Sequence, residues 1–154
     1  MKRIMLNTNV YGRPFDDKTN PDVKSEADYA ERVIELAELK KVKIITPDIL
    51  YAELSLIGDL RKREVILNEI NSISDERIST NNKIHGLAEG LNLIIRDYSD
   101  DLHIASAAIS GCDCLVTCDK QLVKAKSKIE RFLLSKSYKL AIVTPKEFID
   151  SFSD

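Results

Sequence analysis

Short apolar segments alternate with longer amphipathic segments throughout the chain, and this alternation constrains the fold more than any other feature. The short segments are candidates for buried strands and lie at residues 4–6, 42–45, 115–117 and 141–143, with an edge strand at Ile78. The longer segments repeat apolar residues near the helical period and lie at residues 21–40, 47–58, 59–73, 83–93, 100–110 and 120–135. Strands that alternate with helices in this way are typical of a parallel sheet covered by helices on both faces. We therefore predict an α/β fold, specifically a three-layer α/β/α sandwich with a mainly parallel central sheet.

Two threonine–proline pairs mark predicted helix starts. Thr46 precedes Pro47 and Thr144 precedes Pro145, which predicts a threonine N-cap followed by proline in the first helical position. Glu147 is also placed to complete a capping box with Thr144.

The length and composition indicate one ordinary globular domain spanning residues 1–154. The chain is 44% hydrophobic and 31% charged, and it shows no internal repeat or linker. Its formal net charge of −2 excludes the whole-molecule positive field of many nucleic-acid-binding proteins. No apolar run approaches the length of about 18 residues that a membrane span needs, and residues 4–6 are too few for a signal peptide. We expect a cytoplasmic protein that does not bind membranes.

The three cysteines, Cys112, Cys114 and Cys118, lie close together in the sequence. An odd, clustered set suits a reducing compartment better than a disulfide framework. A zinc or redox cluster is the alternative, but Cys114 falls inside a strand-like run and no pair has CxxC spacing. We expect small thiols in the core or near a site.

Polar residues directly follow two predicted strands, at the carboxyl edge where parallel sheets bind ligands. Asn7, Thr8 and Asn9 come after the first strand, and Asp119 follows the strand at 115–117. Loop and helix capping would explain either group alone. Their coincidence at one edge favours a site.

Acidic residues on predicted helices add to this edge. Glu53 falls within the apolar stripe of its helix, where a carboxylate is costly unless it is paired or binds a metal; a structural salt bridge is the alternative. Asp100 and Asp101 begin another helix, where capping alone also suits acids, and periodicity places Asp101 on the apolar side. Either aspartate could therefore reach the sheet edge. His103 is expected to be a packing histidine rather than a ligand.

Carboxylates from separate elements suit Mg²⁺ or Mn²⁺, which prefer hard oxygen ligands. Such ions can activate water and stabilise charge at phosphorus. The sequence contains neither a GxGxxG nor a GxxxxGK[ST] phosphate-binding loop, and no Ser or Cys nucleophile triad is evident.

Four segments together resemble the PIN domain family, the fold of VapC-like toxin ribonucleases and their prokaryotic relatives. They are Met5-Leu6-Asn7-Thr8-Asn9-Val10, Thr46-Pro47-Asp48 through Glu53, Asp100-Asp101-Leu102-His103-Ile104-Ala105-Ser106-Ala107, and Leu115-Val116-Thr117-Cys118-Asp119. The first is similar to the family's hydrophobic pair followed by Asp-Thr-Asn, the third to Asp-Ala-Leu-His-Ile-Ala, and the fourth to Val-Thr-x-Asp. None is specific alone, but their order and spacing across nearly the whole chain indicate the family.

The resemblance implies a site and an activity. Glu53, Asp100 and Asp119 match the family's acids, and Asn7 occupies the place of the first acid. The motif selects Asp100 over Asp101, because the family residue lies three before the histidine. The four positions would form a Mg²⁺ or Mn²⁺ site that hydrolyses RNA phosphodiesters. Residues that would orient these ligands through hydrogen bonds are Thr8, Asn9 and Thr117. The family also implies a possible antitoxin partner and a homodimer.

Asn7 departs from the family pattern, since its amide offers one neutral oxygen instead of a carboxylate. A loss of about 3 kcal/mol of transition-state stabilisation would lower the rate roughly 100-fold. The asparagine is either an engineered substitution that silences a toxic nuclease or a natural change. We expect a metal-dependent ribonuclease whose activity is weakened or abolished. A catalytically silent PIN-fold module that binds RNA or a protein partner is the alternative.

Two groups of basic residues are candidates for an RNA path beside the acids, with a solvated helix face as the alternative. They are Arg61-Lys62-Arg63 and the row Lys120, Lys124, Lys126, Lys128 and Arg131. A phosphotransfer domain of the haloacid dehalogenase type and a receiver domain are disfavoured, because each needs aspartate after the first strand, where this chain has Asn7 and Asn9.

Overall fold

The computed structural model describes residues 1–153, which are built around a five-stranded sheet with the strand order β3-β2-β1-β4-β5. The strands are β1 (Arg3–Leu6), β2 (Lys43–Pro47), β3 (Ser74–Ile78), β4 (Cys114–Val116) and β5 (Ala141–Val143). Every neighbouring pair of strands runs parallel. The predicted α/β fold with a mainly parallel central sheet is therefore confirmed.

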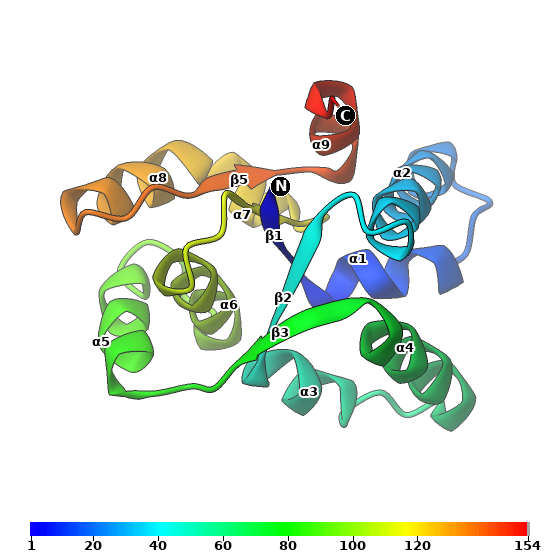
Figure 1. The fold of residues 1–154 in the computed structure, drawn as a ribbon, viewed down its shortest axis with the longest axis horizontal. Helices are drawn as coiled ribbons and strands as arrows, with labels where there is room; N and C mark the ends of the chain where they lie inside the picture. The colour runs from blue at the N-terminus through cyan, green and yellow to red at the C-terminus, as the bar shows by residue number, and fades with distance from the viewer. Residues whose placement is uncertain (154) are drawn as a thin grey trace.

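Helices cover both faces of this sheet (Figure 1). The helices that bury side chains on one face are α1 (Thr8–Gly12), α2 (Pro21–Glu38), α4 (Leu60–Ile73) and α9 (Pro145–Ser151). Those on the other face are α5 (Asn82–Leu91), α6 (Tyr98–Ile109), α7 (Lys120–Lys124) and α8 (Lys126–Ser135). The short helix α3 (Asp48–Leu54) follows the carboxyl end of β2.

Consecutive residues of the central strands face opposite layers. Ile4 and Leu6 of β1 pack in the core cluster that includes α2 and α4, whereas Met5 packs with α5 and α6. In β4, Val116 and Leu115 divide between the two clusters in the same way. A strand with both faces buried needs apolar residues at successive positions. This requirement explains the short unbroken apolar runs in the sequence.

The helix start predicted from Thr46 and Pro47 is wrong. Thr46 is fully buried in β2, and its hydroxyl oxygen lies 2.8 Å from the hydroxyl oxygen of Ser74 on β3. Its side chain is therefore occupied across the sheet and does not cap a helix. Pro47 is the N-cap instead, and α3 ends at Leu54 rather than near Gly58.

Two further helix predictions have different outcomes. The basic helix expected at 120–135 is interrupted at Ala125, which ends α7, so α7 and α8 are separate helices. The second threonine–proline start is confirmed, because Thr144 caps α9 and Glu147 completes a capping box. Residues 8–15 form α1 and a short 3-10 helix, η1 (Arg13–Phe15), that the apolar pattern does not predict.

The three cysteine side chains, Cys112, Cys114 and Cys118, are buried and form no disulfide. In the part of the chain that the structure describes, no helix combines the length and apolar character needed to cross a membrane.

Candidate active site

A hollow at the carboxyl edge of the sheet gathers most of the polar residues singled out by the sequence. Its volume is about 340 Å³. Asn7 reaches it from the end of β1, Glu53 from α3, and Asp100 from α6. The other residues that line it are Thr8, Asn9, Gly12, Asp16, Ile57, Lys62 and Ile66.

Asn7 is held on both sides of its amide group. Its side-chain oxygen accepts a 2.7 Å hydrogen bond from the backbone N–H of Thr8 and caps α1, as asparagine commonly does. Its side-chain nitrogen donates a 3.0 Å bond to the Thr117 hydroxyl. The side chain is only 4% exposed, so these bonds fix its orientation.

Glu53 is bound by two neighbours on separate elements. The Thr8 hydroxyl donates a 2.6 Å hydrogen bond to its Oε1, and the same oxygen contacts Nε2 of His103. Burial raises the pKa of Glu53, but the bonds from His103 and Thr8 outweigh this effect and leave the pKa below its ordinary value. Glu53 therefore carries a negative charge at the hollow at neutral pH.

His103 is fully buried on α6 and contacts Glu53 directly. Its Nδ1 has no hydrogen-bond partner among residues 1–153. His103, expected from the sequence to be a packing histidine, is buried and also fixes a candidate site carboxylate. The signal available in the sequence was that Glu53 and His103 both fall on apolar helix faces, where two polar groups most readily satisfy each other.

Asp100 and Asp101 lie in different surroundings. Asp100 lines the hollow, and burial together with the charges of Asp97, Asp119 and Glu53 raises its pKa to about 7. Asp101 is fully buried away from the hollow and accepts a 2.8 Å hydrogen bond from the Asn92 side chain. Burial raises the pKa of Asp101 to about 6. The family motif therefore selects the aspartate that faces the hollow, whereas helical periodicity favours the one that is buried.

Asp119 lies beside the hollow and does not line it. Its side chain caps α7 by accepting hydrogen bonds from the backbone N–H groups of Gln121 and Leu122, at 2.8 and 3.3 Å. It is close enough to Asp100 for its charge to raise the pKa of that carboxyl. Thr117 links the two ends of the site, because its hydroxyl accepts from both Asn7 and the backbone N–H of Asp119.

The described residues contain no group of three or more His, Cys, Asp or Glu side chains already arranged to hold a metal ion. The donor chemistry at the hollow nevertheless suits a divalent cation, because the carboxyl of Asp100 lies among like charges that raise its pKa. Glu53 and Asp100 are the side chains best placed to hold such an ion, with Asp119 next to them.

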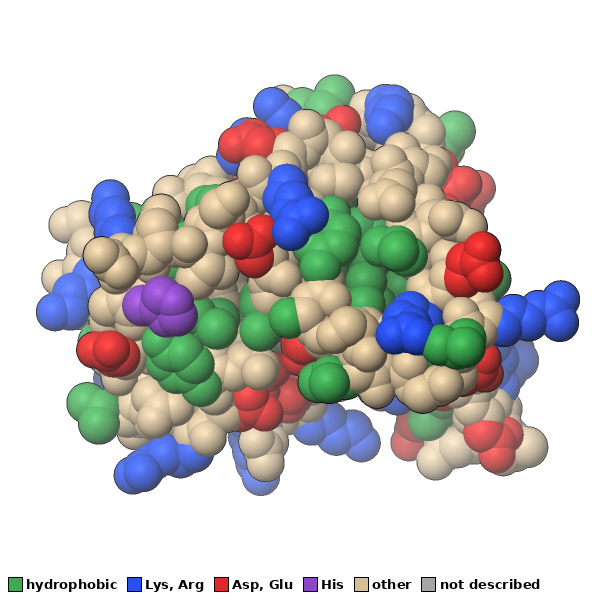
Figure 2. All heavy atoms as spheres, turned by 90° about the horizontal axis from the view of Figure 1, so that it is seen from below, with side chains coloured by type: hydrophobic (Ala, Val, Ile, Leu, Met, Phe, Trp, Pro, Cys, Tyr) green, Lys and Arg blue, Asp and Glu red, His purple; other side chains and the backbone are tan. Residues whose placement is uncertain are grey.

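The basic residues predicted to form an RNA path do not gather at one place. Lys62 lines the hollow itself. Lys120 and Lys124 line a separate cavity of about 560 Å³ together with Lys146. Lys126 instead forms an ion pair with Glu147. On the face shown in Figure 2, Lys and Arg side chains are scattered among acidic and apolar ones rather than gathered into one patch.

Comparison with known proteins shows the fold and does not assign a family. No family model matches the chain, and no curated protein matches it. Among solved structures, the chain is similar to one chain of the crystal structure of VapBC2 from Rickettsia felis bound to a DNA fragment from their promoter. The TM-score is 0.57 at 19% sequence identity, and the match covers 91% of this chain and 98% of that chain. At this identity the likeness confirms the PIN-like α/β fold expected from the sequence.

Proposed function

We propose that the chain is a metal-dependent endoribonuclease of the PIN type, with activity weakened or abolished by Asn7. The observation that carries this proposal is the hollow at the carboxyl edge of the sheet, where Asn7, Glu53 and Asp100 meet beside Asp119. Ligands of open parallel sheets bind at this edge. The likeness to a VapBC2 chain supports the same assignment at the level of the fold.

Glu53, Asp100 and Asp119 would hold Mg²⁺ or Mn²⁺, with the amide oxygen of Asn7 as a weaker neutral ligand. When bound, the ion would polarise a phosphodiester oxygen and lower the pKa of a bound water. Thr8 and His103 hold the Glu53 carboxylate in place through the bonds described above. Lys62, which lines the same hollow, carries the positive charge that can bind a substrate phosphate.

The structure around Asn7 can accept an aspartate. The Thr117 hydroxyl receives two hydrogen bonds, from Asn7 and from the Asp119 backbone, while its own proton is free to donate. In an Asn7→Asp variant this proton can bind the new oxygen, and the bond from the Thr8 backbone N–H remains. The substitution therefore adds a negative charge without requiring a change in the surrounding chain.

The partners in this proposal are RNA as substrate, an antitoxin protein and a second copy of the chain, in the cytoplasm. The proposal of an antitoxin partner is supported by the likeness of this chain to one chain of the VapBC2 structure, in which VapBC2 is bound to a DNA fragment from their promoter. Exposed apolar side chains such as Leu56 and Leu60, which are 84% and 67% exposed, support contacts with another protein surface.

The test compares RNA cleavage by the chain and by its Asn7→Asp variant in Mn²⁺ and Mg²⁺, with and without a chelator. We expect the variant to cleave about 100-fold faster than the chain, and chelation to abolish cleavage. Asn82→Asp, an exposed position at the start of α5, is the matched control for one added charge and should behave as the unsubstituted chain. Absence of metal-dependent cleavage in the Asn7→Asp variant with a panel of RNAs would refute the nuclease assignment.

A silent PIN-fold module is the second candidate, and the state of Asn7 favours it. Both polar atoms of the amide are already hydrogen-bonded within the protein, so the side chain is stable without a metal. If the chain binds RNA with equal affinity before and after Asn7→Asp, and neither form cleaves it, the silent module is the correct function.

A further inference from the structure

A cavity of about 560 Å³ lies at the carboxyl edge of the sheet, between α2, α7 and the start of α9. Thr144, which directly follows β5, lines it. We call it the lysine cavity, because Lys120, Lys124 and Lys146 are among its lining residues. The nuclease proposal does not use this space.

The lysine cavity adjoins the candidate active site. Cys118 and Lys120, which line the cavity, stand on either side of Asp119 in the sequence. The backbone N–H of Cys118 donates a 3.0 Å hydrogen bond to Oδ1 of Asn9, which lines the hollow. A strand bound at the hollow can therefore continue past Asp119 into the cavity.

The lysine cavity carries an excess of positive charge, whereas the whole chain has a formal net charge of −2. Lys120 and Lys124 are exposed, and neither forms an ion pair with any of residues 1–153. Lys146 is already paired within α9. Glu26, which also lines the cavity, is paired with Arg13 at 3.1 Å. Two lysines therefore remain to bind an anion.

Apolar and aromatic side chains lie between these charges. Pro145 is buried, and Tyr29 and Val123 are partly buried. The ring of Tyr29 lies near two cations, with Nζ of Lys146 at 5.8 Å and Cζ of Arg32 at 5.3 Å from its centroid. A partly open aromatic ring beside lysines suits a ligand that joins a planar ring to a phosphate.

A single-stranded nucleic acid offers both groups at every nucleotide, because each base has a face that stacks and each phosphate has a negative charge. The volume of the cavity falls within the range of about 300–1,000 Å³ that small organic ligands occupy, so one base has room to enter. An acidic peptide would satisfy the two lysines but leave Tyr29 and Val123 uncovered.

We propose that the lysine cavity binds one unstacked nucleotide of the RNA strand, next to the phosphate held at the candidate active site. Lys120 and Lys124 bind its phosphates, and Tyr29 stacks on its base. The identity of the strand rests on the proposed function, but the contact can be measured without cleavage. The base in the cavity then helps to determine which RNA the chain binds.

The probe is an oligouridylate of about six nucleotides with a fluorophore at one end. Its binding to the full chain is followed by fluorescence anisotropy in chelator, where metal-dependent cleavage cannot occur. A second oligonucleotide has the same sugar–phosphate backbone but no bases. We expect the abasic strand to bind at least about fivefold more weakly, because it has no base to stack on Tyr29, and added salt to weaken binding of both strands.

Variants locate the contact. Lys124→Glu should weaken binding of both strands by about fivefold or more, because it removes a phosphate contact and adds a negative charge. Lys139→Glu, at an exposed lysine before the amino end of β5 and outside the cavity, is the matched control and should change binding by less than about twofold.

Tyr29 separates base stacking from charge. Tyr29→Leu should lower the affinity for oligouridylate to that for the abasic strand, whereas Tyr29→Phe keeps the ring and should bind as the unsubstituted chain does. Circular dichroism checks that each variant is folded.

Five results would overturn the proposal. They are no binding of oligouridylate at about 1 mM, equal affinity for the two strands, and equal weakening by Lys124→Glu and Lys139→Glu. The fourth is displacement of RNA by an oligoglutamate peptide of equal charge, which would assign the cavity to an acidic protein segment. The fifth is tighter binding of uridine monophosphate than of oligouridylate, which would assign it to a free nucleotide. Metal-dependent cleavage by the Asn7→Asp variant is a separate assay, so the nuclease proposal and this one can fail independently.

Discussion

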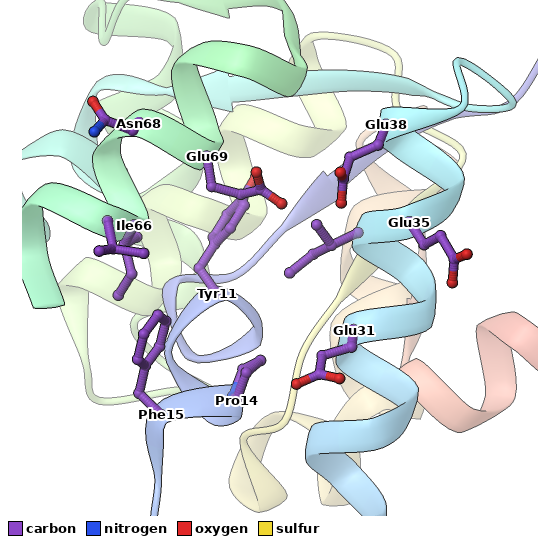
Figure 3. Close-up of a pocket in the computed structure, with 11 residues that line it drawn as sticks. Tyr11, Pro14, Phe15, Glu31, Glu35, Glu38, Ile66, Asn68 and Glu69 are labelled. Carbon is purple, nitrogen blue, oxygen red and sulfur yellow. The ribbon is translucent and has the colours of Figure 1, made fainter.

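The candidate active site and the α2–α4 groove, a depression of about 670 Å³ between α2 and α4 (Figure 3), share Ile66 and both contain carboxylates, but they organise them in opposite ways. At the active site, Glu53 is fixed by Thr8 and His103, and Asn7 is fixed by Thr117 and the α1 backbone. In the groove, Glu35 and Glu38 are exposed residues of α2 that line the depression together with apolar side chains.

The difference separates two uses of acidic side chains. Oxygens held at fixed positions by hydrogen bonds suit directional chemistry on a bound ion or substrate. Exposed carboxylates around an apolar depression suit a charge-complementary protein surface, where the exact position of each charge matters less. A change at one region should therefore affect chemistry, and a similar change at the other should leave the chemistry unchanged.

The largest expected effect is the loss of RNA cleavage when Asp100 is substituted. In the Asn7→Asp background, Asp100→Asn should lower RNA cleavage by about 100-fold or more, because it removes a candidate ligand charge from the hollow. Glu38→Gln in the groove should leave cleavage within about twofold. Initial rates in Mn²⁺ measure both, and a similar loss of rate in the two variants would contradict the separation.

Substitution of His103 tests whether its buried contact with Glu53 contributes to the stability of the fold. His103→Ala should lower the free energy of unfolding by about 2–4 kcal/mol, since it opens a cavity and leaves Glu53 with only the Thr8 hydrogen bond of its two described contacts. His85→Ala is the control, because His85 is exposed and its ring interacts with Tyr98. Urea unfolding followed by circular dichroism measures both. A loss at His103 no larger than at His85 would mean that the Glu53 contact does not support the fold.

The pH dependence of stability follows from Asp100 and Asp101. Their pKa values are raised to about 7 and about 6, above the ordinary value of 3.8. Between about pH 4 and pH 7 these two carboxyls therefore bind more protons in the folded chain than in the unfolded chain, so their contribution to stability falls as pH rises. Urea unfolding in chelator should show this fall, and Asp100→Asn should reduce it. A metal-free stability that rises across the window would contradict these shifts.

Tyr11→Phe should have the smallest effect on stability, and it should stabilise the chain whereas His103→Ala destabilises it. Tyr11→Phe removes a buried hydroxyl that has no hydrogen-bond partner within residues 1–153, so the free chain should gain about 1 kcal/mol of stability. Thermal unfolding measures the gain, with Tyr138→Phe as a control at a partly buried tyrosine outside the groove. A clear loss of stability in Tyr11→Phe would show that the hydroxyl is satisfied within the free protein.

The sequence predicts the sheet and its layers well because the buried strands impose a strong local pattern. Ile4, Met5 and Leu6 must be apolar whichever layer they face, so the strand is visible without knowing its neighbours. Helix ends are predicted less well. Thr46 satisfies its hydroxyl on a distant strand, and the threonine–proline pair alone does not distinguish it from the capping Thr144. The local difference is the capping-box residue, which is Glu147 after Thr144 but Ile49 after Thr46.

The same difference between local patterns and distant contacts decides which features of the candidate site the sequence predicts. The family motif identifies Asp100 by its distance from the histidine, whereas periodicity points to Asp101, which is buried beside Asn92. The contact between Glu53 and His103 joins residues 50 positions apart, so no local pattern contains it. The α2–α4 groove was not predicted for the same reason, because its acidic and apolar side chains come from separate helices.

Mn²⁺ binding tests the central claim most directly, because it measures the site without needing the correct RNA. Calorimetry should show the Asn7→Asp variant binding Mn²⁺ at least about tenfold more tightly than the chain as given. Adding Glu53→Gln and Asp100→Asn to that variant should remove this binding, while Glu35→Gln and Glu38→Gln in the groove should leave it unchanged. Equal Mn²⁺ affinity in the chain and in all of these variants would contradict a metal site at the carboxyl edge of the sheet.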